Sequence, residues 1–521
     1  MNAAPQRSRA AQPARAQAWI LALGVAGLAA ATRFPLIANV PGEADSARFL
    51  IGLEQWRRFG PRGHFIYGVV FSPGYYWLAA HWMRWWGEPL ARAGVALAWL
   101  SALAAVLSAP LIYYLGRRCL PARAAAATAA VFLLTPGYWW LGIEAHPQQL
   151  SILLLLAALA LVGWGLERRR PRARMGTLVA AAVVWALALL VKSDAVLLAP
   201  ALVVLAITAG RGVRAWPARA LAGTAVAAGG AGLFVLLRQA LLGASVGAAQ
   251  ATAGRVLAQF WAWPGPRAAA RQAAPILFAA GPVIWLWVLA GGALAWAAAR
   301  RRGSARGFAA RRGLGPLGLL AAAWALPLYG FWWLIRGNNA RHVALAILPL
   351  LWLAGWGWEA WFRRRLLPAG RLALLTGLMV LALVVLNAEA VPASSNITLF
   401  PSGNVPASAA MLRAKETVMR GWAARIEQSD GCYFGRYTPP YLIADLLAAD
   451  PRAQLGRAGA AAAVAEGRRE ARFFTIATPA QIGAVRRACP GAVSLEYNRA
   501  GHHQRFLGSE WRGLPLAGRF Y

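Results

Sequence analysis

The chain contains eleven apolar runs, and most of them are as long as a segment that crosses a lipid bilayer. A spanning α-helix needs about 20 predominantly apolar residues. The fifth and sixth runs are short and almost meet at Lys192 and Asp194, so they form either two helices or one broken helix. We therefore predict an α-helical polytopic membrane protein with about 11 transmembrane helices. The runs lie at residues 17–38, 90–116, 121–141, 147–166, 176–191, 194–210, 219–242, 275–299, 314–335, 341–361 and 371–388.

Composition supports this class and argues against nucleic acid as a partner. Hydrophobic residues make up 59% of the chain and charged residues 14%, whereas soluble domains are about half apolar and about a quarter charged. The formal net charge of +36 comes from 54 Lys and Arg residues against 18 Asp and Glu. In a soluble protein this excess predicts binding to nucleic acid. Here most arginines form short clusters between apolar runs, where they orient helices.

Arginine clusters occupy every second connection between the apolar runs, and this predicts the orientation of each helix. Positively charged connections stay on the cytoplasmic side, so residues 1–16 are predicted to be cytoplasmic. If the fifth and sixth runs were one helix, the later clusters would face outside, so the pattern favours eleven crossings. The first run lacks a clear cleavage site and is expected to remain as a helix. The richness in Ala, Arg and Trp is typical of a bacterial genome, which predicts a bacterial inner membrane.

Residues 40–89 are predicted to form a long first periplasmic loop within the membrane module at residues 17–388. The part from residue 72 to residue 86 is rich in Trp and Tyr. These side chains favour the headgroup region of a membrane. We therefore predict an interfacial helix in this part of the loop.

Residues 389–521 are predicted to form a small periplasmic α/β domain. Three short strand-like runs alternate with Ala-rich helical stretches, which is typical of that class. About 130 residues can bury a core of their own. Cys432 and Cys489 lie here, in an oxidising compartment, and the sequence leaves open whether they form a disulfide. The runs are Cys432–Phe434, Arg472–Ile476 and Val493–Tyr497.

The ionisable residues near helix ends gather on the predicted periplasmic side. Intramembrane charges are costly and usually mark function. The cytoplasmic connections carry arginines and almost no acids, whereas the periplasmic side has both acids and cations. The residues are Glu43, Asp45, Arg48, Glu144, His146, Lys192, Asp194, Arg336, Arg341 and His342.

A carboxylate beside cations at a membrane surface suits sugar transfer from a polyprenyl-phosphate lipid. The acceptor hydroxyl needs a general base, which Asp or Glu can supply. The departing polyprenyl phosphate gains negative charge that Arg and Lys stabilise. Because the lipid tail stays in the bilayer, the site is expected at a cavity between helix ends, where interfacial aromatic residues can cover the tail.

Several motifs, in order along residues 20–360, resemble those of GT-C glycosyltransferases. The run Gly42–Phe49 resembles the acidic first-loop motif of the protein O-mannosyltransferase and lipid A aminoarabinose transferase group. Ser72–Leu78 resembles its Pro-Pro-Leu-Tyr-Tyr-Trp-Leu motif, and Leu187–Lys192 resembles its Gly-Leu-x-x-Leu-x-Lys segment. Arg341 and His342 resemble its Arg-Tyr pair, with His in place of Tyr. A serine, Ser46, stands where the family has its second acid, although Glu43 lies just upstream.

The resemblance implies an inverting, polyprenyl-phosphate-sugar-dependent glycosyltransferase with a GT-C-like fold. Asp45 is then the catalytic or positioning carboxylate, supported by Glu43. The donor phosphate would be held by Lys192, Arg341 and Arg48. Substrate contacts would come from Tyr75, Tyr76, Glu144, His146 and His342. A divalent metal stays open, with Asp45, Glu144 and His146 as candidate ligands, because no ligand spacing demands one.

Plainer interpretations remain for each residue and for the whole chain. Asp45 could cap a helix, Lys192 could pair with Asp194 or extend to the interface, and His146 could lie in a capped loop. A lipid or solute transporter or flippase also buries charges, but it usually shows internal repeats that are not evident here. A non-catalytic partner of an envelope complex is a third alternative. The sequence names neither the sugar nor the acceptor, which could be a lipid, a glycan or a protein.

Overall fold

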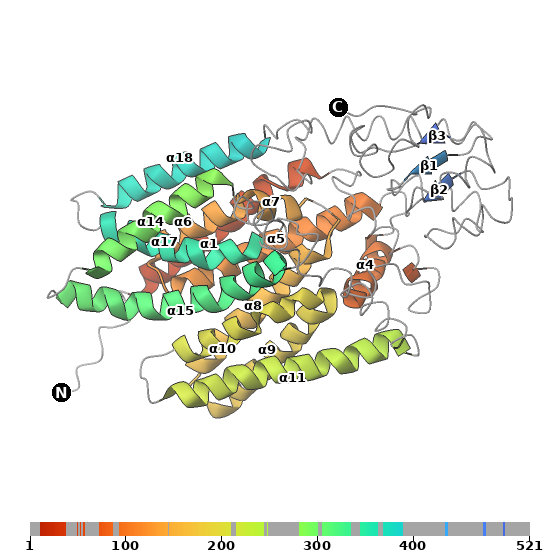
Figure 1. The fold of residues 1–521 in the computed structure, drawn as a ribbon, viewed down its shortest axis with the longest axis horizontal. Coiled ribbons are helices and arrows are strands. Elements are labelled where there is room, and N and C mark those ends of the chain that lie inside the picture. Colours follow the sequence, from red (N-terminus) through yellow and green to blue (C-terminus); the bar gives the residue numbers. More distant parts are fainter. Residues whose placement is uncertain are drawn as a thin grey trace.

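A computed structural model of the chain shows a long body of helices and a small three-stranded sheet (Figure 1). The structure describes residues 11–37, 49, 53, 56–57, 72–86, 93–143, 145–209, 215–243, 247, 281–300, 305–334, 344–362, 368–388, 433–435, 473–475 and 493–494. All statements below concern these residues.

Helices account for nearly all of the described chain. In the first half they are α1 (Ala11–Ala31), η2 (Phe34–Leu36), α4 (Pro73–Trp86), α5 (Ala93–Arg117), α6 (Ala122–Leu133), α7 (Pro136–Leu141), α8 (Pro147–Glu167), α9 (Pro171–Val191), η5 (Ser193–Leu198), α10 (Ala199–Thr208) and α11 (Trp216–Leu242). The second half has α14 (Pro282–Arg300), α15 (Ala305–Leu334), η8 (Ala344–Ala346), α17 (Ile347–Phe362) and α18 (Pro368–Ala388). The strands are β1 (Tyr433–Gly435), β2 (Phe473–Thr475) and β3 (Val493–Ser494).

Five helices are long and apolar enough to cross a membrane, which confirms the prediction of a helical membrane protein. Six shorter apolar helices occupy the remaining predicted runs, so each of the eleven runs contains an apolar helix. The third run is divided into α6 and α7, with Thr135 between them and Pro136 as the first residue of α7. Proline has no backbone N–H and suits the first helical position, so the new helix starts there. The number of crossings stays a prediction.

The helical body has two ends, which differ in the residues that gather there. At one end a buried cluster joins the beginnings of α4, α5 and α8 with the ends of α9 and α11. At the other end Arg118, just after α5, contacts Glu167 of α8 and Ala209 after α10. We call these the Lys192 end and the Arg118 end. Because α9 and α11 finish at the same end, η5 and α10 form a separate return pass between them, as the arginine pattern predicts.

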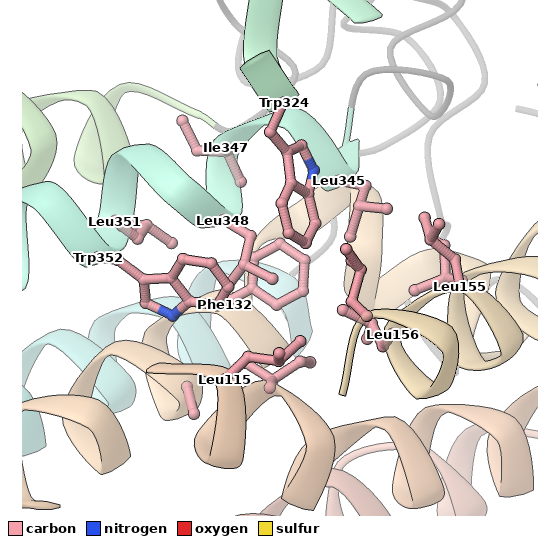
Figure 2. Packing of buried hydrophobic residues seen from close by; sticks show 14 of the residues in the cluster. Leu115, Phe132, Leu155, Leu156, Trp324, Leu345, Ile347, Leu348, Leu351 and Trp352 are labelled. Carbon is pink, nitrogen blue, oxygen red and sulfur yellow. The ribbon is translucent and has the colours of Figure 1, made fainter. Parts of the chain in front are cut away.

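The larger of two buried clusters runs through the helical body and joins its two halves (Figure 2). Trp352 and Leu348 of α17 pack against Phe132 of α6, and Leu115 of α5 lies below them. Trp324 of α15 meets Trp352 edge-on, with ring centroids 5.6 Å apart and planes at 89°. Edge-to-face packing of this kind stabilises aromatic pairs beyond the area they bury. The core therefore fixes α15 and α17 against the helices of the first half.

Glycine allows the closest approach between two helices of the second half. A Cβ atom added at Gly357 of α17 would collide with the backbone oxygen of Gly291 in α14. One added at Gly291 would lie 2.6 Å from the carbonyl oxygen of Ala354. Small residues at helix interfaces in membranes permit such contact, and van der Waals packing then drives association.

The short strands coincide with the three strand-like runs that the sequence predicts. They pair in parallel in the order β2-β1-β3. Parallel neighbours need a crossover of about a dozen residues or more, and residues 436–472 and 476–492 provide it. In Figure 1 the sheet lies beyond the helical body, toward the side on which α4 lies. The helices of the predicted α/β domain fall outside the described residues, so the domain stays a prediction.

Candidate functional site

The Lys192 end brings together four of the segments in which the sequence places candidate residues. Tyr75 and Tyr76 of α4 share one buried cluster with Leu53, Ala145 and Val191. These three residues come from the first loop, the connection before α8 and the end of α9. The predicted gathering of distant segments at one end is therefore observed for the part of the site that the structure describes.

Gly74 explains how α4 reaches the end of α9. A Cβ atom at this position would lie 2.9 Å from the Leu190 side chain and 3.0 Å from its carbonyl oxygen. Any larger residue would therefore push α4 away from α9. Because Leu190 lies two residues before Lys192, this contact holds the N-terminus of α4 close to the lysine. The glycine of the Ser-Pro-Gly-Tyr-Tyr run thus has a direct packing role.

Lys192 lies where α9 ends and η5 begins, and it pairs with Asp194. The Lys192 Nζ atom is 2.8 Å from Asp194 Oδ2, and the two side chains are 12% and 18% exposed. Lys192 has an extended backbone, and its amide donates to the Ala188 carbonyl oxygen at 2.9 Å. An ammonium group carries three N–H donors, so pairing with one carboxylate oxygen does not exhaust its capacity to bind an anion.

His146 is the N-cap of α8 and is almost completely buried. Its Nδ1 atom accepts a hydrogen bond from the Gln148 amide at 3.2 Å. Ser101 of α5 donates to the His146 carbonyl oxygen at 3.4 Å. A neutral imidazole that accepts at Nδ1 carries its proton on Nε2. The cap therefore favours the tautomer with the proton on Nε2, and binding of a metal through Nε2 would require that proton to leave. The role of His146 as a candidate ligand stays a prediction.

Phe49 links the first loop to the same place. Its ring meets His146 edge-on at a centroid distance of 4.8 Å and Tyr75 at 5.8 Å. Phe49 is four residues after Asp45 and one after Arg48. The described end of the acidic motif therefore lies against the cap of α8.

Tyr75 and Tyr76 serve as packing residues in this state. Both are buried, at 1% and 0% exposure, and their rings meet at 5.7 Å and 73°. The Tyr75 hydroxyl has no hydrogen-bond partner among the described residues. Burial raises the pKa of this hydroxyl, so it stays protonated at physiological pH. A substrate contact through Tyr75 would require a change in its surroundings.

The remaining predicted site residues lie outside the described part of the chain. No group of three or more His, Cys, Asp or Glu within the described ranges could hold a metal. A metal site with the predicted ligands would need Asp45 and Glu144, which are among the undescribed residues below, together with His146. These residues are Asp45, Glu144, Glu43, Arg48, Arg336, Arg341 and His342, as are Cys432 and Cys489 of the tail.

Arg33 is a residue at this end that the sequence interpretation did not single out. It is fully buried just after α1, and its guanidinium donates to the Leu133 carbonyl oxygen at 2.7 Å. It also lies over the Tyr138 ring, 5.5 Å from the centroid. A signal was present, because Arg33 is the one charged residue of the run at 17–38. A charge inside an apolar run usually marks function.

A comparison with family models finds one that matches part of the chain. Residues 70–236 match the family described as dolichyl-phosphate-mannose-protein mannosyltransferase. The segment contains α4 to α11 apart from the last residues of α11, and it includes Tyr75, His146 and Lys192. The predicted resemblance to the GT-C glycosyltransferases is therefore confirmed for this segment. None of the curated proteins matches the chain.

Solved structures with a similar course of the chain are distant in sequence. One is an oligosaccharyltransferase of Archaeoglobus fulgidus tethered to an acceptor peptide, at TM-score 0.47 and 12% identity over 82% of this chain. The chain spans 63% of that protein's length. Another is ArnT from Cupriavidus metallidurans, at TM-score 0.44 and 16% identity over 83% of this chain and 85% of that one. A further ArnT structure, bound to undecaprenyl phosphate, has TM-score 0.41, 18% identity and coverages of 82% and 73%.

Proposed function

We propose that the chain is an integral-membrane glycosyltransferase that moves a sugar from a polyprenyl-phosphate donor to an envelope lipid, glycan or protein. The observation that carries this proposal is the match of residues 70–236 to a family named for a dolichyl-phosphate sugar donor. The gathering of the first loop, the α8 cap and the Lys192 segment at one end of the body supports it. The site would face the periplasm of a bacterial inner membrane.

The proposed arrangement follows the predicted segments of the chain. Residues 1–16 would be cytoplasmic, residues 17–388 would form the catalytic membrane module, and residues 389–521 would form a periplasmic domain. With about 11 crossings and a cytoplasmic N-terminus, the tail falls on the same side as the site. The tail would then touch the acceptor or close over the site.

Lys192 is the described residue best suited to the donor phosphate. Its ammonium lies at a helix break and is largely buried and held by Asp194. The N-terminus of α4 packs against Leu190, two residues before the lysine. A cation in such a poorly hydrated place interacts strongly with a phosphate. Arg341 and Arg48 would complete the phosphate contacts.

The reaction needs one proton transfer and one displacement. Asp45, supported by Glu43, would take the proton of the acceptor hydroxyl while that oxygen attacks the anomeric carbon. The bond from this carbon to the phosphate oxygen breaks, and its electron pair leaves with the polyprenyl phosphate. Attack from the face opposite the leaving group inverts the anomeric configuration. Lys192 would stabilise the charge that develops on the phosphate.

Transfer from a labelled polyprenyl-phosphate sugar in reconstituted vesicles tests the proposal. Asp45→Asn is expected to reduce the rate by about 100-fold or more, since general bases contribute factors of that order. Glu167→Gln, which changes an acid at the Arg118 end, is the matched control and should keep the rate. Full activity of Asp45→Asn would refute the role of Asp45, and no transfer by the wild type from any polyprenyl-phosphate sugar would refute the function.

A further inference from the structure

Arg33 is a buried cation whose partners among the described residues are not carboxylates. Its side chain is fully buried, yet no carboxylate among the described residues lies within 4.0 Å of it. Removing a cation from water costs several kcal/mol unless other groups compensate. A position with this cost is retained only if the charge has a use.

Carbonyl oxygens and one ring take the place of a counter-ion. The Nη1 atom donates to Thr32 Oγ1 at 3.1 Å and to the Ala29 carbonyl oxygen at 3.4 Å. The Nη2 atom donates to the Leu133 carbonyl oxygen at 2.7 Å, and the guanidinium lies over the Tyr138 ring. The first two partners belong to α1 and the residue after it, whereas the last two belong to the segment that leads into α8.

Gly142 closes the remaining side of the guanidinium. A Cβ atom at Gly142 would collide with Arg33 Nε and would lie 2.8 Å from its Cδ atom and 3.2 Å from Ala105 Cβ. The Nε atom has no hydrogen-bond partner among the described residues. Since Gly142 and Ala105 fill the space next to it, a small anion has no room there. The geometry therefore fits a side chain that links two segments by hydrogen bonds better than an anion-binding site.

A second contact joins the same two segments. The Trp139 indole N–H donates to the Thr32 carbonyl oxygen at 3.0 Å. Beyond Arg33, Phe34 stacks on Trp99 of α5 at 4.8 Å and 28°. The start of the first loop is thus fixed both to the connection before α8 and to α5.

We propose that Arg33 is a positioning residue of the transferase site, tying the start of the first loop to the segment 133–146. The first loop carries the acidic motif with Asp45, and the other segment carries Glu144 and ends at His146. The buried guanidinium holds the residues that lead into the first loop against the segment that leads to His146. This inference rests on the proposed function for its consequence but not for its geometry.

Chemical modification of His146 measures whether the contacts of Arg33 keep this segment closed to reagent. Diethyl pyrocarbonate followed by peptide mass spectrometry reports the reactivity of each histidine. In the wild type the buried His146 should be protected, while the exposed His81 on α4 reacts and serves as an internal standard. In Arg33→Gln the segment should open, and His146 should react at least about tenfold faster.

Three further measurements separate positioning from general damage. Arg33→Lys keeps the cation and should restore much of the protection, and Arg118→Gln removes an arginine at the other end and should leave His146 protected. Binding of undecaprenyl phosphate should change by less than about threefold in Arg33→Gln, because Lys192 lies on a different segment. If undecaprenyl phosphate does not bind the wild type, the proposed function is contradicted. The His146 reactivities would still test the positioning role of Arg33. Protected His146 in Arg33→Gln, or equal exposure in Arg118→Gln, would overturn the positioning role.

Discussion

Arg33 and Arg118 each follow an apolar helix, but they lie at opposite ends of the body in opposite surroundings. Arg118 is 11% exposed and pairs at 3.0 Å with Glu167, which is 53% exposed, so water reaches the pair through the acid. Arg33 is fully buried among carbonyl oxygens and a tyrosine ring. A charge that water reaches costs little and can serve to orient a helix. A charge kept away from water requires a fixed set of partners, so the Lys192 end is the one built for positioning.

The ion pairs of the two ends differ in the same way. The cations Arg118 and Lys192 are similarly enclosed, at 11% and 12% exposure, whereas their acids differ, with Asp194 at 18% and Glu167 at 53%. Exposed pairs contribute little because solvent and salt screen them. Breaking a poorly hydrated pair leaves an uncompensated charge. The Lys192 pair is therefore expected to be the more sensitive to substitution.

The largest contrast is expected between aromatic residues of the two ends. Tyr75→Ala should reduce the free energy of unfolding by about 3 kcal/mol or more, because it leaves a cavity in a packed cluster. Trp164→Ala at the Arg118 end removes a ring that is 46% exposed and covered by Arg168, with the guanidinium 3.7 Å from the ring centre. It should cost about 1 kcal/mol. Denaturant unfolding in detergent compares the two.

Tyr75→Phe sharpens this comparison, since it keeps the ring and removes only the hydroxyl. The hydroxyl has no hydrogen-bond partner among the described residues. Stability should therefore stay the same or rise, because removing an unpaired buried polar group is not penalised. A clear loss of transfer activity at unchanged stability would show instead that the Tyr75 hydroxyl contacts the substrate.

A matched pair of glycines gives the next effect. Gly142→Ala forces a Cβ atom onto the Arg33 side chain, which is buried and cannot move away. Gly163→Ala places a Cβ atom 2.6 Å from Arg118 Nη1, at the far end of the side chain, where the guanidinium pairs with the half-exposed Glu167. We expect a loss of about 3 kcal/mol for the first and about 1 kcal/mol for the second. Equal thermal shifts in the two variants would contradict the difference in freedom between the two arginines.

Single acid substitutions should give the smallest contrast. Asp194→Asn is expected to reduce the free energy of unfolding by about 1–2 kcal/mol, and Glu167→Gln by about 0.5 kcal/mol or less. The effect of Glu167→Gln should vanish at high salt because its pair is exposed. Unfolding curves at low and high ionic strength measure both effects. A larger loss of unfolding free energy for Glu167→Gln than for Asp194→Asn would contradict the distinction between the two ends.

The apolar runs and arginine clusters predicted most of the helices because bilayer thickness and side-chain charge leave few alternatives. A helix predicted at 72–86 appears as α4 (Pro73–Trp86), and its interfacial location stays a prediction. The strands β2 and β3 lie within their predicted runs, and β1 extends one residue beyond its run. The gathering of the Lys192 and His146 segments followed from predicted helix parity. Contacts that depend on packing could not be predicted, such as the approach of Gly74 to Leu190 or of Gly142 to Arg33. No periodic pattern encodes which neighbour a side chain will meet.

Arg33 shows where the interpretation of the sequence was incomplete. Its place inside the first apolar run was visible, but the ties to Leu133 and Tyr138 span about a hundred residues of sequence. His146 shows the opposite case. The plainer interpretation was a capped, solvated loop. The structure shows the cap, but His146 is buried, so the expected solvation was wrong. The roles predicted for Asp45, Glu43, Arg48, Arg341 and His342 stay predictions, because these residues are outside the described ranges.

Binding of undecaprenyl phosphate to the purified protein tests the central claim that the Lys192 end holds a polyprenyl-phosphate carrier. A ligand that binds only the folded state raises the melting temperature. The account predicts that saturating lipid raises the melting temperature of the wild type and of Arg118→Met by the same amount, and that Lys192→Met loses most of the shift. Equal shifts in all three proteins would place the carrier elsewhere, and no shift in the wild type would contradict the claim.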